Sequence, residues 1–308
     1  MANSASPLQR NPLDAQAVLV PVARATPRVS LWRRVRQIGM FILYAIVVVL
    51  FITPFAWMIL SAFKSTAEIF RYAYPLTIWT FIPPNPTLAN FHSIFFQWGF
   101  GQKLLNSLIA SSAQMIGTLV ICSMAAFVFA RLHFRGRDIL FAVVLLAALI
   151  PFEVNMVPLY LVVRSLHLQN TYVALFIPWI ANPFGIFLLR QAFLEIPRDF
   201  DDAALVEGAS PFQIFWHVIL PNARPALITL ALMSFLWSWN AFLWPLIVMQ
   251  DQNKQVIQVA IATFTVPQEL PAWGEIFAAA SIATIPILIL FIALQRYYIR
   301  GAVLSGIK

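Results

Sequence analysis

Six long stretches of apolar residues, separated by polar or charged segments, dominate the pattern of this chain. Each stretch is long enough for one membrane crossing, because about 20 apolar residues span the hydrocarbon core of a bilayer. Pro residues fall in or near several stretches, and since membrane helices tolerate Pro, we expect kinked helices and not broken ones. The pattern predicts an all-α fold, a polytopic membrane protein with six transmembrane helices. The predicted spans are Ile38–Phe63, Leu104–Ala130, Ile139–Val163, Tyr172–Leu189, Pro225–Met249 and Glu275–Leu294.

Composition supports this class. Of the 308 residues, 61% are apolar and 10% are charged, and the mean hydropathy is +0.80. A soluble domain carries about 25% charged residues, so this chain has too little polar surface to coat a globule in water. The single cysteine, Cys122, lies inside an apolar stretch and the four histidines are scattered, so neither a disulfide nor a metal site is predicted.

The cations indicate the orientation in the membrane. Of the 20 Lys and Arg residues, 15 fall on the side that holds both termini and the 2–3 and 4–5 loops, and five fall on the other side. Cytoplasmic loops carry such an excess, so both termini are predicted to be cytoplasmic. The net charge of +8 is explained in the same way, without nucleic-acid binding. Residues 1–36, polar and rich in Pro, predict a disordered tail and not a cleaved signal peptide.

The loop between the fourth and fifth spans, residues 190–224, begins with the signals of a short helix. Asp199 is a candidate N-cap, with Asp202 three residues later in the position of a capping box. Gly208 is placed to end this helix in a left-handed conformation. Between Asp199 and Gly208, Asp201 and Asp202 place negative charge in the first turn, and Ala203 and Ala204 favour a helix.

A second helix is predicted directly after the first. Ser210 is its candidate N-cap, Pro211 its first residue, and Gln213 the third residue after the cap. Pro221 stops the helix. Its apolar residues recur at helical spacing in one stripe: Phe212, Phe215, Trp216 and Ile219. The loop thus predicts a two-helix elbow, which is either a rigid lever to a peripheral protein or simply a stable loop.

The same residues resemble a known family. Asp202-Ala-Ala, then Gly208, then Val218-Ile-Leu-Pro221 resembles the "EAA–G–I-LP" loop of binding-protein-dependent ABC importer permeases, with Asp202 in place of the usual Glu and Val218 in place of Ile. In that family the loop is a cytoplasmic coupling helix that docks into a groove on the ATP-binding subunit. The resemblance implies ten coupling residues: Asp201, Asp202, Ala203, Ala204, Gly208, Ala209, Pro211, Phe212, Leu220 and Pro221.

The resemblance covers roughly residues 38–308 and is strongest to the sugar-type branch that includes the maltose permease partner subunit. Segments such as Asn106-Ser-Leu, Val157-Pro-Leu-Tyr160 and Trp239-Asn-Ala-Phe-Leu-Trp-Pro-Leu246 carry it. It implies a sugar or oligosaccharide as substrate, or a polyol or glycerol-3-phosphate-like solute as the alternative. The implied domains are a tail at 1–36, the first helix and external loop at 37–101, an ABC transmembrane type-1 domain at 102–296, and a cytoplasmic tail at 297–308.

The resemblance also implies partners in a bacterial or archaeal cytoplasmic membrane: a second permease subunit, two ATP-binding cassette subunits and an extracytoplasmic solute-binding protein. This chain lacks a GxxxxGK[ST] phosphate loop and any nucleophile–base or metal set. It is therefore expected to be non-catalytic and to bind no cofactor, with ATP and Mg hydrolysed by partner subunits. An ion-coupled secondary transporter is one other hypothesis, but no inverted repeat or paired charge supports it. An intramembrane enzyme is another, but it would need a His, Asp or Glu set at one depth, and the histidines lie in loops or at span ends.

Polar residues inside the spans are candidates for the substrate pathway. Glu153 and Asn155 lie in the third span, where a charged group should face a cavity, a partner or the interface. Ser234, Trp237 and Asn240 form a polar-aromatic cluster in the fifth span that would suit sugar recognition. Hydrogen bonding between packed helices is the competing interpretation of this cluster.

Overall fold

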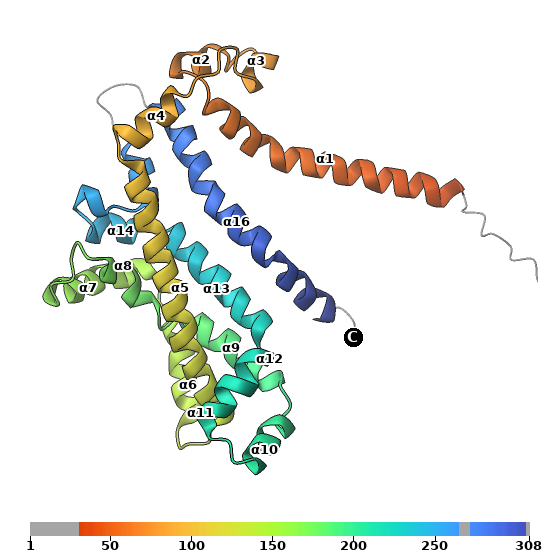
Figure 1. Cartoon of the computed structure of the whole chain (residues 1–308), viewed down its shortest axis with the longest axis vertical. Helices are drawn as coiled ribbons and strands as arrows, with labels where there is room; N and C mark the ends of the chain where they lie inside the picture. Colours follow the sequence, from red (N-terminus) through yellow and green to blue (C-terminus); the bar gives the residue numbers. More distant parts are fainter. Residues whose placement is uncertain (1–30, 265–271, 306–308) are drawn as a thin grey trace, which may run out of the picture. The chain divides into compact units, whose positions relative to one another are not determined.

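The computed structural model describes residues 31–264 and 272–305, and all regular structure within these ranges is helical (Figure 1). The predicted all-α fold is confirmed. The chain forms two units, residues 1–53 and residues 54–308. Of the predicted tail at 1–36, residues 1–30 lie outside the described residues, and helix α1 already begins at Leu31. The last helix, α16, extends through most of the predicted C-terminal tail to Ser305.

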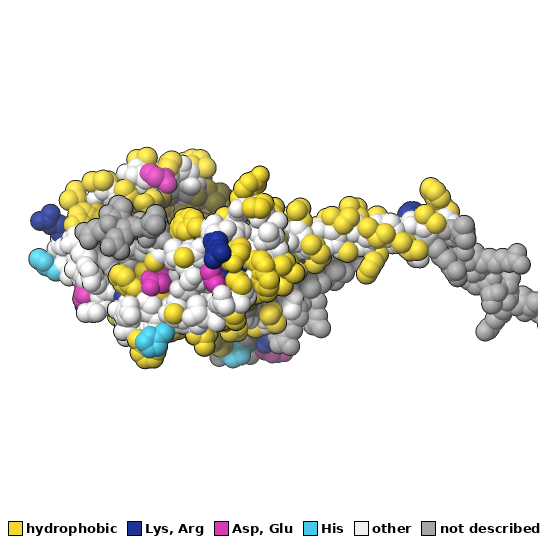
Figure 2. Space-filling view, turned by 90° about the horizontal axis from the view of Figure 1, so that it is seen from above, with side chains coloured by type: hydrophobic (Ala, Val, Ile, Leu, Met, Phe, Trp, Pro, Cys, Tyr) yellow, Lys and Arg dark blue, Asp and Glu magenta, His cyan; other side chains and the backbone are white. Residues whose placement is uncertain are grey.

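The first unit contains most of helix α1 (Leu31–Ser61). From Ile38 to Ile52 its large apolar side chains are exposed on all sides of the helix. Figure 2 shows hydrophobic side chains along this helix with few charged ones between them. A helix that is apolar all round is suited to a membrane, because lipid can surround each of these side chains.

Three helices among the described residues are long and apolar enough to cross a membrane: Val35–Ser61 of α1, α5 (Phe100–Arg131), and Trp273–Gln295 of α16 (Trp273–Ser305). There are up to six crossings if each of three bent helix pairs forms one span. The pairs are α6 (Arg137–Ala147) with α7 (Phe152–Ser165), α8 and η2 (Tyr172–Phe176 and Ile177–Trp179) with α9 (Pro183–Glu195), and Pro211–Asn222 with α13 (Arg224–Trp239).

The expectation of kinked and unbroken helices is wrong for these regions. The axes of α6 and α7 differ by 99°, and those on either side of Ile180–Asn182 by 48°. Pro151 is the N-cap of α7 and Pro183 the first residue of α9. Pro has no backbone N–H, and the N–H groups of the first helical turn have no partner within the helix. Pro is therefore well suited to the start of a helix, and here it begins a new one. The fifth span also divides, since α13 ends at Trp239 and α14 (Leu243–Val248) follows separately.

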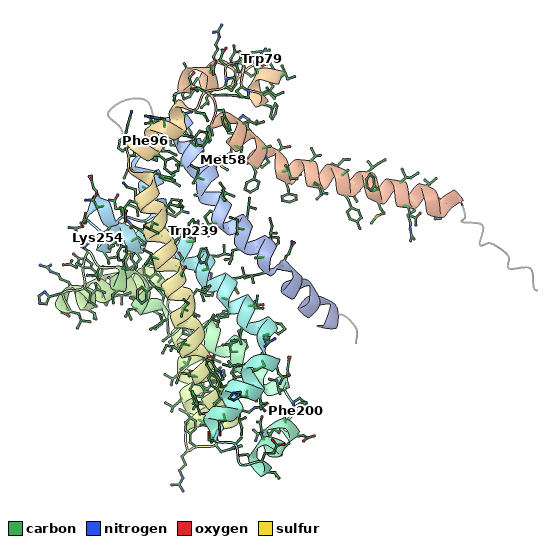
Figure 3. All side chains as sticks on the ribbon, viewed as in Figure 1. Met58, Trp79, Phe96, Phe200, Trp239 and Lys254 are labelled. Carbon is green, nitrogen blue, oxygen red and sulfur yellow. The ribbon has the colours of Figure 1, made fainter. Side chains whose placement is uncertain are left out.

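Helix α5 is the centre of the second unit, where it packs against α9 and α13 (Figure 1). Gly185 of α9 permits this close packing: a Cβ there would lie 2.9 Å from Leu230 Cδ1 and 3.1 Å from Cys122 Sγ. On the other side of α13, α16 covers Trp239 (Figure 3). The Trp239 indole N–H donates to the Ala283 carbonyl at 3.2 Å, which fixes the pair of helices by a buried hydrogen bond.

The segment between α1 and α5 forms three short helices, α2 (Thr66–Arg71), α3 (Ile78–Phe81) and α4 (Ala89–Phe96). Lys64 is buried beneath them, and its Nζ donates to the carbonyls of Trp79 and Thr80 at 2.9 and 2.7 Å. Burial lowers the pKa of Lys64, and the carboxylate of Glu68 opposes this. The remaining helices are α10 (Asp199–Val206), α11 (Pro211–Ile214), η3 (Phe215–Ile219), α12 (Leu220–Asn222), η4 (Gln252–Lys254) and α15 (Ile257–Thr263).

Candidate functional site

The elbow, residues 199–221, lies at the end of the second unit opposite to α2–α4 (Figure 1). Its first helix, α10, starts differently from the prediction. The N-cap is Arg198 and makes no side-chain capping bond, so the assignment of Asp199 as the cap is wrong. Asp199 is instead the first helical residue, and with Asp201 and Asp202 it places negative charge in the first turn. That position is favourable, because the helix dipole is positive at this end.

The corner between the two elbow helices has the predicted left-handed glycine. Gly208 has a φ of 84°. Its N–H donates to the Leu205 carbonyl at 3.0 Å, and the Ala209 N–H donates to the Ala204 carbonyl at 2.9 Å. These two bonds form a Schellman motif, which satisfies the last carbonyls of α10. The chain direction at the corner is therefore set by local hydrogen bonds.

The second elbow helix begins as the sequence predicts. Ser210 accepts a hydrogen bond from the Gln213 N–H, the Gln213 side chain accepts from the Ser210 N–H at 2.7 Å, and Pro211 follows the cap. The predicted apolar stripe, however, is divided between core and surface. Phe215 and Ile219 are buried, whereas Phe212 and Trp216 are 66% and 58% exposed. Residues Phe215–Ile219 form a π-helical turn within this helix.

Arg131, the last residue of α5, binds the elbow through two polar contacts. Its Nε lies 3.0 Å from Asp201 Oδ2, and both side chains are almost buried. Its Nη2 donates to the Ile196 carbonyl at 2.8 Å, just before α10. Burial raises the pKa of Asp201, and the positive charge of Arg131 opposes this shift. One cation therefore ties both the entry and the first turn of the elbow to α5.

The outer face of the elbow carries apolar side chains. Val206 is 90% exposed, and Phe200 and Leu205 are more than half exposed. Figure 3 shows Phe200 on α10 at the end of the unit. We call these three residues, together with the exposed Phe212 and Trp216 of the second elbow helix and its π-helical turn, the elbow face. Of the other predicted coupling residues, Asp202 and Ala203 are exposed, as is Pro221, while Ala204, Ala209 and Leu220 pack partly against the core.

Two adjoining cavities lie beside α13, and α5 lines the first of them. The first has a volume of about 500 Å³ and the second about 600 Å³. Phe152, Trp179, Asn182 and Trp237 line both, so we call them the paired cavities. Among the residues of the described chain that line them, none is Asp, Glu, Lys, Arg or His. The site is therefore apolar and aromatic with a few neutral polar groups, as is usual for small-molecule sites.

The aromatic wall of the first cavity is held in a fixed arrangement. The rings of Phe152, Trp179 and Trp244 meet edge to face, with centroids 5.2 Å apart for Phe152–Trp179 and 6.1 Å for Trp179–Trp244. The Trp244 indole N–H donates to the Ala174 carbonyl at 2.8 Å. Trp237 packs edge to face on Phe184, with centroids 5.8 Å apart. Such pairs stabilise ring orientation beyond simple burial.

The predicted pathway residues lie in different places. Trp237 lines both cavities and Asn155 lines the second. Glu153 is exposed outside both linings. Ser234 is buried away from both, with no hydrogen bond for its hydroxyl. The Asn240 amide donates to the Leu236 carbonyl of its own helix at 2.9 Å, which is not the bond between packed helices that the competing interpretation expected.

Sequence reasoning missed three lining residues, Gln114, Trp179 and Asn182. A signal was present for two of them, because a side-chain amide inside an apolar span is costly without a partner. Trp179 gave no such signal, since an aromatic residue is common in a membrane helix. Within residues 31–264 and 272–305, no three His, Cys, Asp or Glu side chains come together as a metal site requires.

Comparisons with known proteins give a consistent result. Residues 117–303 match the family described as binding-protein-dependent transport system inner membrane component. The arabinooligosaccharides transport system permease protein AraQ of Halalkalibacterium halodurans is 35% identical over 270 residues, which are 86% of this chain and 94% of that protein. The diacetylchitobiose uptake system permease protein NgcG of Streptomyces coelicolor is 32% identical over 271 residues, 87% of this chain and 86% of that protein.

A solved structure has the same fold. It is a chain of a bacterial ABC transporter involved in the import of the acidic polysaccharide alginate. The TM-score is 0.76 at 22% sequence identity, and the match covers 89% of this chain and 100% of that one.

Proposed function

Because this chain belongs to the family of binding-protein-dependent transport system inner membrane components, we propose that it is the permease subunit of an ATP-driven importer for a sugar or oligosaccharide. The names of its relatives support the sugar, since they are described as permeases for arabinooligosaccharides and for diacetylchitobiose. Its role is non-catalytic: partner subunits bind and hydrolyse ATP with Mg, and this chain converts their movement into access for the solute.

The observation that supports this function most directly is that the elbow face is exposed and that the elbow is held rigidly on the second unit. Exposed apolar side chains such as Val206 and Phe212 are unfavourable in water, and a set of them usually marks a contact with another protein. The Schellman corner at Gly208 and the Arg131–Asp201 pair make the elbow stiff. A stiff elbow can transmit a push from a docked ATP-binding subunit to α5.

The proposed topology places the elbow in the cytoplasm. Six spans are obtained by counting α1, α5 and α16 as single crossings and α6–α7, α8–α9 and α13 as the others. Both termini are then cytoplasmic, and α2–α4 face outside, toward the solute-binding protein. A second permease subunit completes the pathway. The type-1 domain predicted at 102–296 remains a prediction, and the family match at 117–303 supports it.

Cross-linking tests the docking directly. The described chain has one native cysteine, Cys122, and it is buried, so Val206→Cys supplies a single accessible thiol at the elbow face. We expect it to cross-link to the ATP-binding subunit in the intact complex. The matched control is a cysteine at Tyr74, which is 88% exposed on the external segment and should not cross-link to that subunit. Cross-linking at Tyr74 but not at Val206 would contradict the proposed orientation.

Charge reversal tests the coupling. Asp202 and Asp199 are both exposed in the first turn of α10 and have similar effects on the helix dipole. We expect Asp202→Lys to uncouple ATP hydrolysis from uptake, because Asp202 lies in the motif that faces the partner, while Asp199→Lys retains most coupling. Gly208→Trp should uncouple as well. Unchanged transport in both Asp202→Lys and Gly208→Trp would contradict the proposal.

A further inference from the structure

Gln114, in the middle of α5, is a largely buried amide to which no residue of the described chain hydrogen-bonds. Its side chain is 5% exposed and lines the first of the paired cavities. Among residues 31–264 and 272–305 no group hydrogen-bonds its amide, whose atoms are open to the cavity and not sealed within the protein. Buried polar groups nearly always have a partner, because an unpaired amide loses its bonds to water without replacement. The group that satisfies Gln114 therefore comes from the contents of the cavity.

Asn182 provides a second unpaired donor on the same wall. Its Oδ1 accepts a hydrogen bond from the Gly185 N–H at 3.0 Å and so caps helix α9. This bond assigns the amide orientation, and it leaves the Nδ2 group without a partner among the described residues. Because Asn182 lines both cavities, its two N–H donors are available where the cavities meet.

The breaks in the helices converge on this same place. Ala148 and Ile150, from the break between α6 and α7, line the second cavity. Asn182 lies in the break before α9, and Ala241 and Phe242, from the break between α13 and α14, line the first. Non-helical backbone at membrane depth is tolerated where it borders a cavity and not where it faces lipid. The three breaks therefore border the paired cavities, where a bound molecule or water can satisfy their freed backbone groups.

The uncharged lining of the paired cavities also disfavours charged solutes. No lining residue of either cavity in the described chain is Asp, Glu, Lys, Arg, His, Tyr or Cys. A carboxylate or phosphate would lose its hydration there without gaining a cation, which is strongly unfavourable. A sugar ring has an apolar C–H face that suits Trp179 and Trp237, and hydroxyl groups that suit neutral amides.

We propose that this chain contributes its own subsite for an uncharged sugar unit, in which Gln114 and Asn182 hydrogen-bond ring hydroxyls and Trp179 and Trp237 pack against the ring. This inference rests on the proposed importer function and narrows its substrate. Anionic sugars and glycerol-3-phosphate-like solutes are excluded from the subsite. Of the polar-aromatic cluster predicted in the fifth span, Trp237 then contacts the substrate, whereas Ser234 does not.

The test uses the complete importer, co-purified with this chain and placed in proteoliposomes. Gln114→Leu removes the amide at nearly constant size. Thr118→Val is the matched control, because Thr118 lies one helical turn further along α5, is 1% exposed, has an unpaired hydroxyl and lines neither cavity. We expect Gln114→Leu to raise KM for uptake about two- to tenfold, the effect of one lost hydrogen bond. Thr118→Val should leave KM unchanged. Asn182→Asp, which keeps the oxygen that caps α9, should raise KM as Gln114→Leu does.

The probes are diacetylchitobiose, arabinotriose and maltotriose as neutral sugars, and an alginate trisaccharide and glycerol 3-phosphate as anions. We expect uptake of at least one neutral probe and of neither anion. Uptake of an anion alone, or a wild-type KM in both Gln114→Leu and Asn182→Asp, would overturn the subsite while leaving the importer function intact. ATP hydrolysis that no probe stimulates, with no uptake of any probe, would instead contradict the proposed function itself.

Discussion

Arg131 Nε and Asp201 Oδ2 lie 3.0 Å apart although 70 positions in the chain separate the two residues, and both side chains are almost completely buried. The pair connects the end of α5, the central helix of the second unit, to the first turn of the elbow. An ion pair at this junction makes the position of the elbow dependent on α5, which also lines the first of the paired cavities through Gln114. The two candidate sites therefore share one rigid helix.

Removal of the cation should loosen the elbow. Arg131→Leu leaves Asp201 buried without its partner, and breaking a buried pair costs about 3–5 kcal/mol. Faster hydrogen exchange in residues 196–221 would report this loss. The matched control is Arg137→Leu, which breaks the Arg137–Asp138 pair, whose carboxylate is 76% exposed, and which should cost less than about 1 kcal/mol. Equal exchange in the two variants would contradict a structural role for the buried pair.

The same variant should show a defined pH dependence. Burial raises the pKa of Asp201, and Arg131 opposes the rise, so Arg131→Leu raises that pKa further. An acid with a raised pKa in the folded state contributes stability that is present below its unfolded pKa and is lost as pH rises through the folded pKa. The destabilisation of Arg131→Leu should thus be greatest at neutral pH and smaller in acid. Hydrogen exchange corrected for intrinsic rates at pH 7.5 and pH 5 measures this, and a larger loss at pH 5 would contradict the assignment.

The corner glycine should tolerate Asn better than Ala. Gly208 has a φ of 84°, and a Cβ there would meet nothing within 4 Å, so any cost comes from backbone strain alone. The left-handed conformation costs about 1–2 kcal/mol for most residues, and Asn adopts it more readily. We expect the ratio of solute imported to ATP hydrolysed to fall in Gly208→Ala and to be largely kept in Gly208→Asn. The same ratio in both variants would exclude backbone strain as the cause.

Substitution of a second glycine, Gly274, should be destabilising because of steric overlap and not because of backbone strain. A Cβ at Gly274, at the start of α16, would lie 2.6 Å from both Nδ2 and Oδ1 of Asn90. Asn90 cannot move away without cost, because its amide donates to the Ala62 and Lys64 carbonyls, both at 2.8 Å. Gly274→Ala should therefore destabilise the second unit by about 1–3 kcal/mol, seen as a lower Tm in detergent. Gly101→Ala is the control, since its Cβ would have only ordinary contacts, 3.7 Å from Phe95 Cδ1.

The N-cap of the second elbow helix should contribute a measurable share of local stability. Ser210 and Gln213 satisfy each other's backbone N–H groups, and loss of such a cap costs about 1 kcal/mol. Ser210→Ala should speed hydrogen exchange in residues 210–216, whereas Ser210→Asp, which also caps, should not. If both variants exchanged at the wild-type rate, the π-helical turn that follows would be held by tertiary packing alone.

The features that the sequence predicted correctly depend on neighbours within a few positions. The capping box at Ser210 and the left-handed end at Gly208 are local hydrogen-bond patterns, and the three long helices follow from unbroken runs of apolar residues. Such signals need no knowledge of the rest of the chain. The cap at Asp199 failed because Arg198 is already helical in backbone conformation there, which the run of acidic residues did not reveal.

The sequence by itself therefore determined the all-helical membrane class and the local shape of the elbow. Only the tertiary structure decided where the helices break, that Arg131 meets Asp201, and that Gln114 faces a cavity with no hydrogen-bond partner among the described residues. The physical reason is that hydropathy and capping act along the chain, whereas a broken helix, a buried ion pair and a cavity are each stabilised by residues far apart in sequence. A Pro in an apolar run is compatible with a kink or a new helix, and the packing around it selects between them.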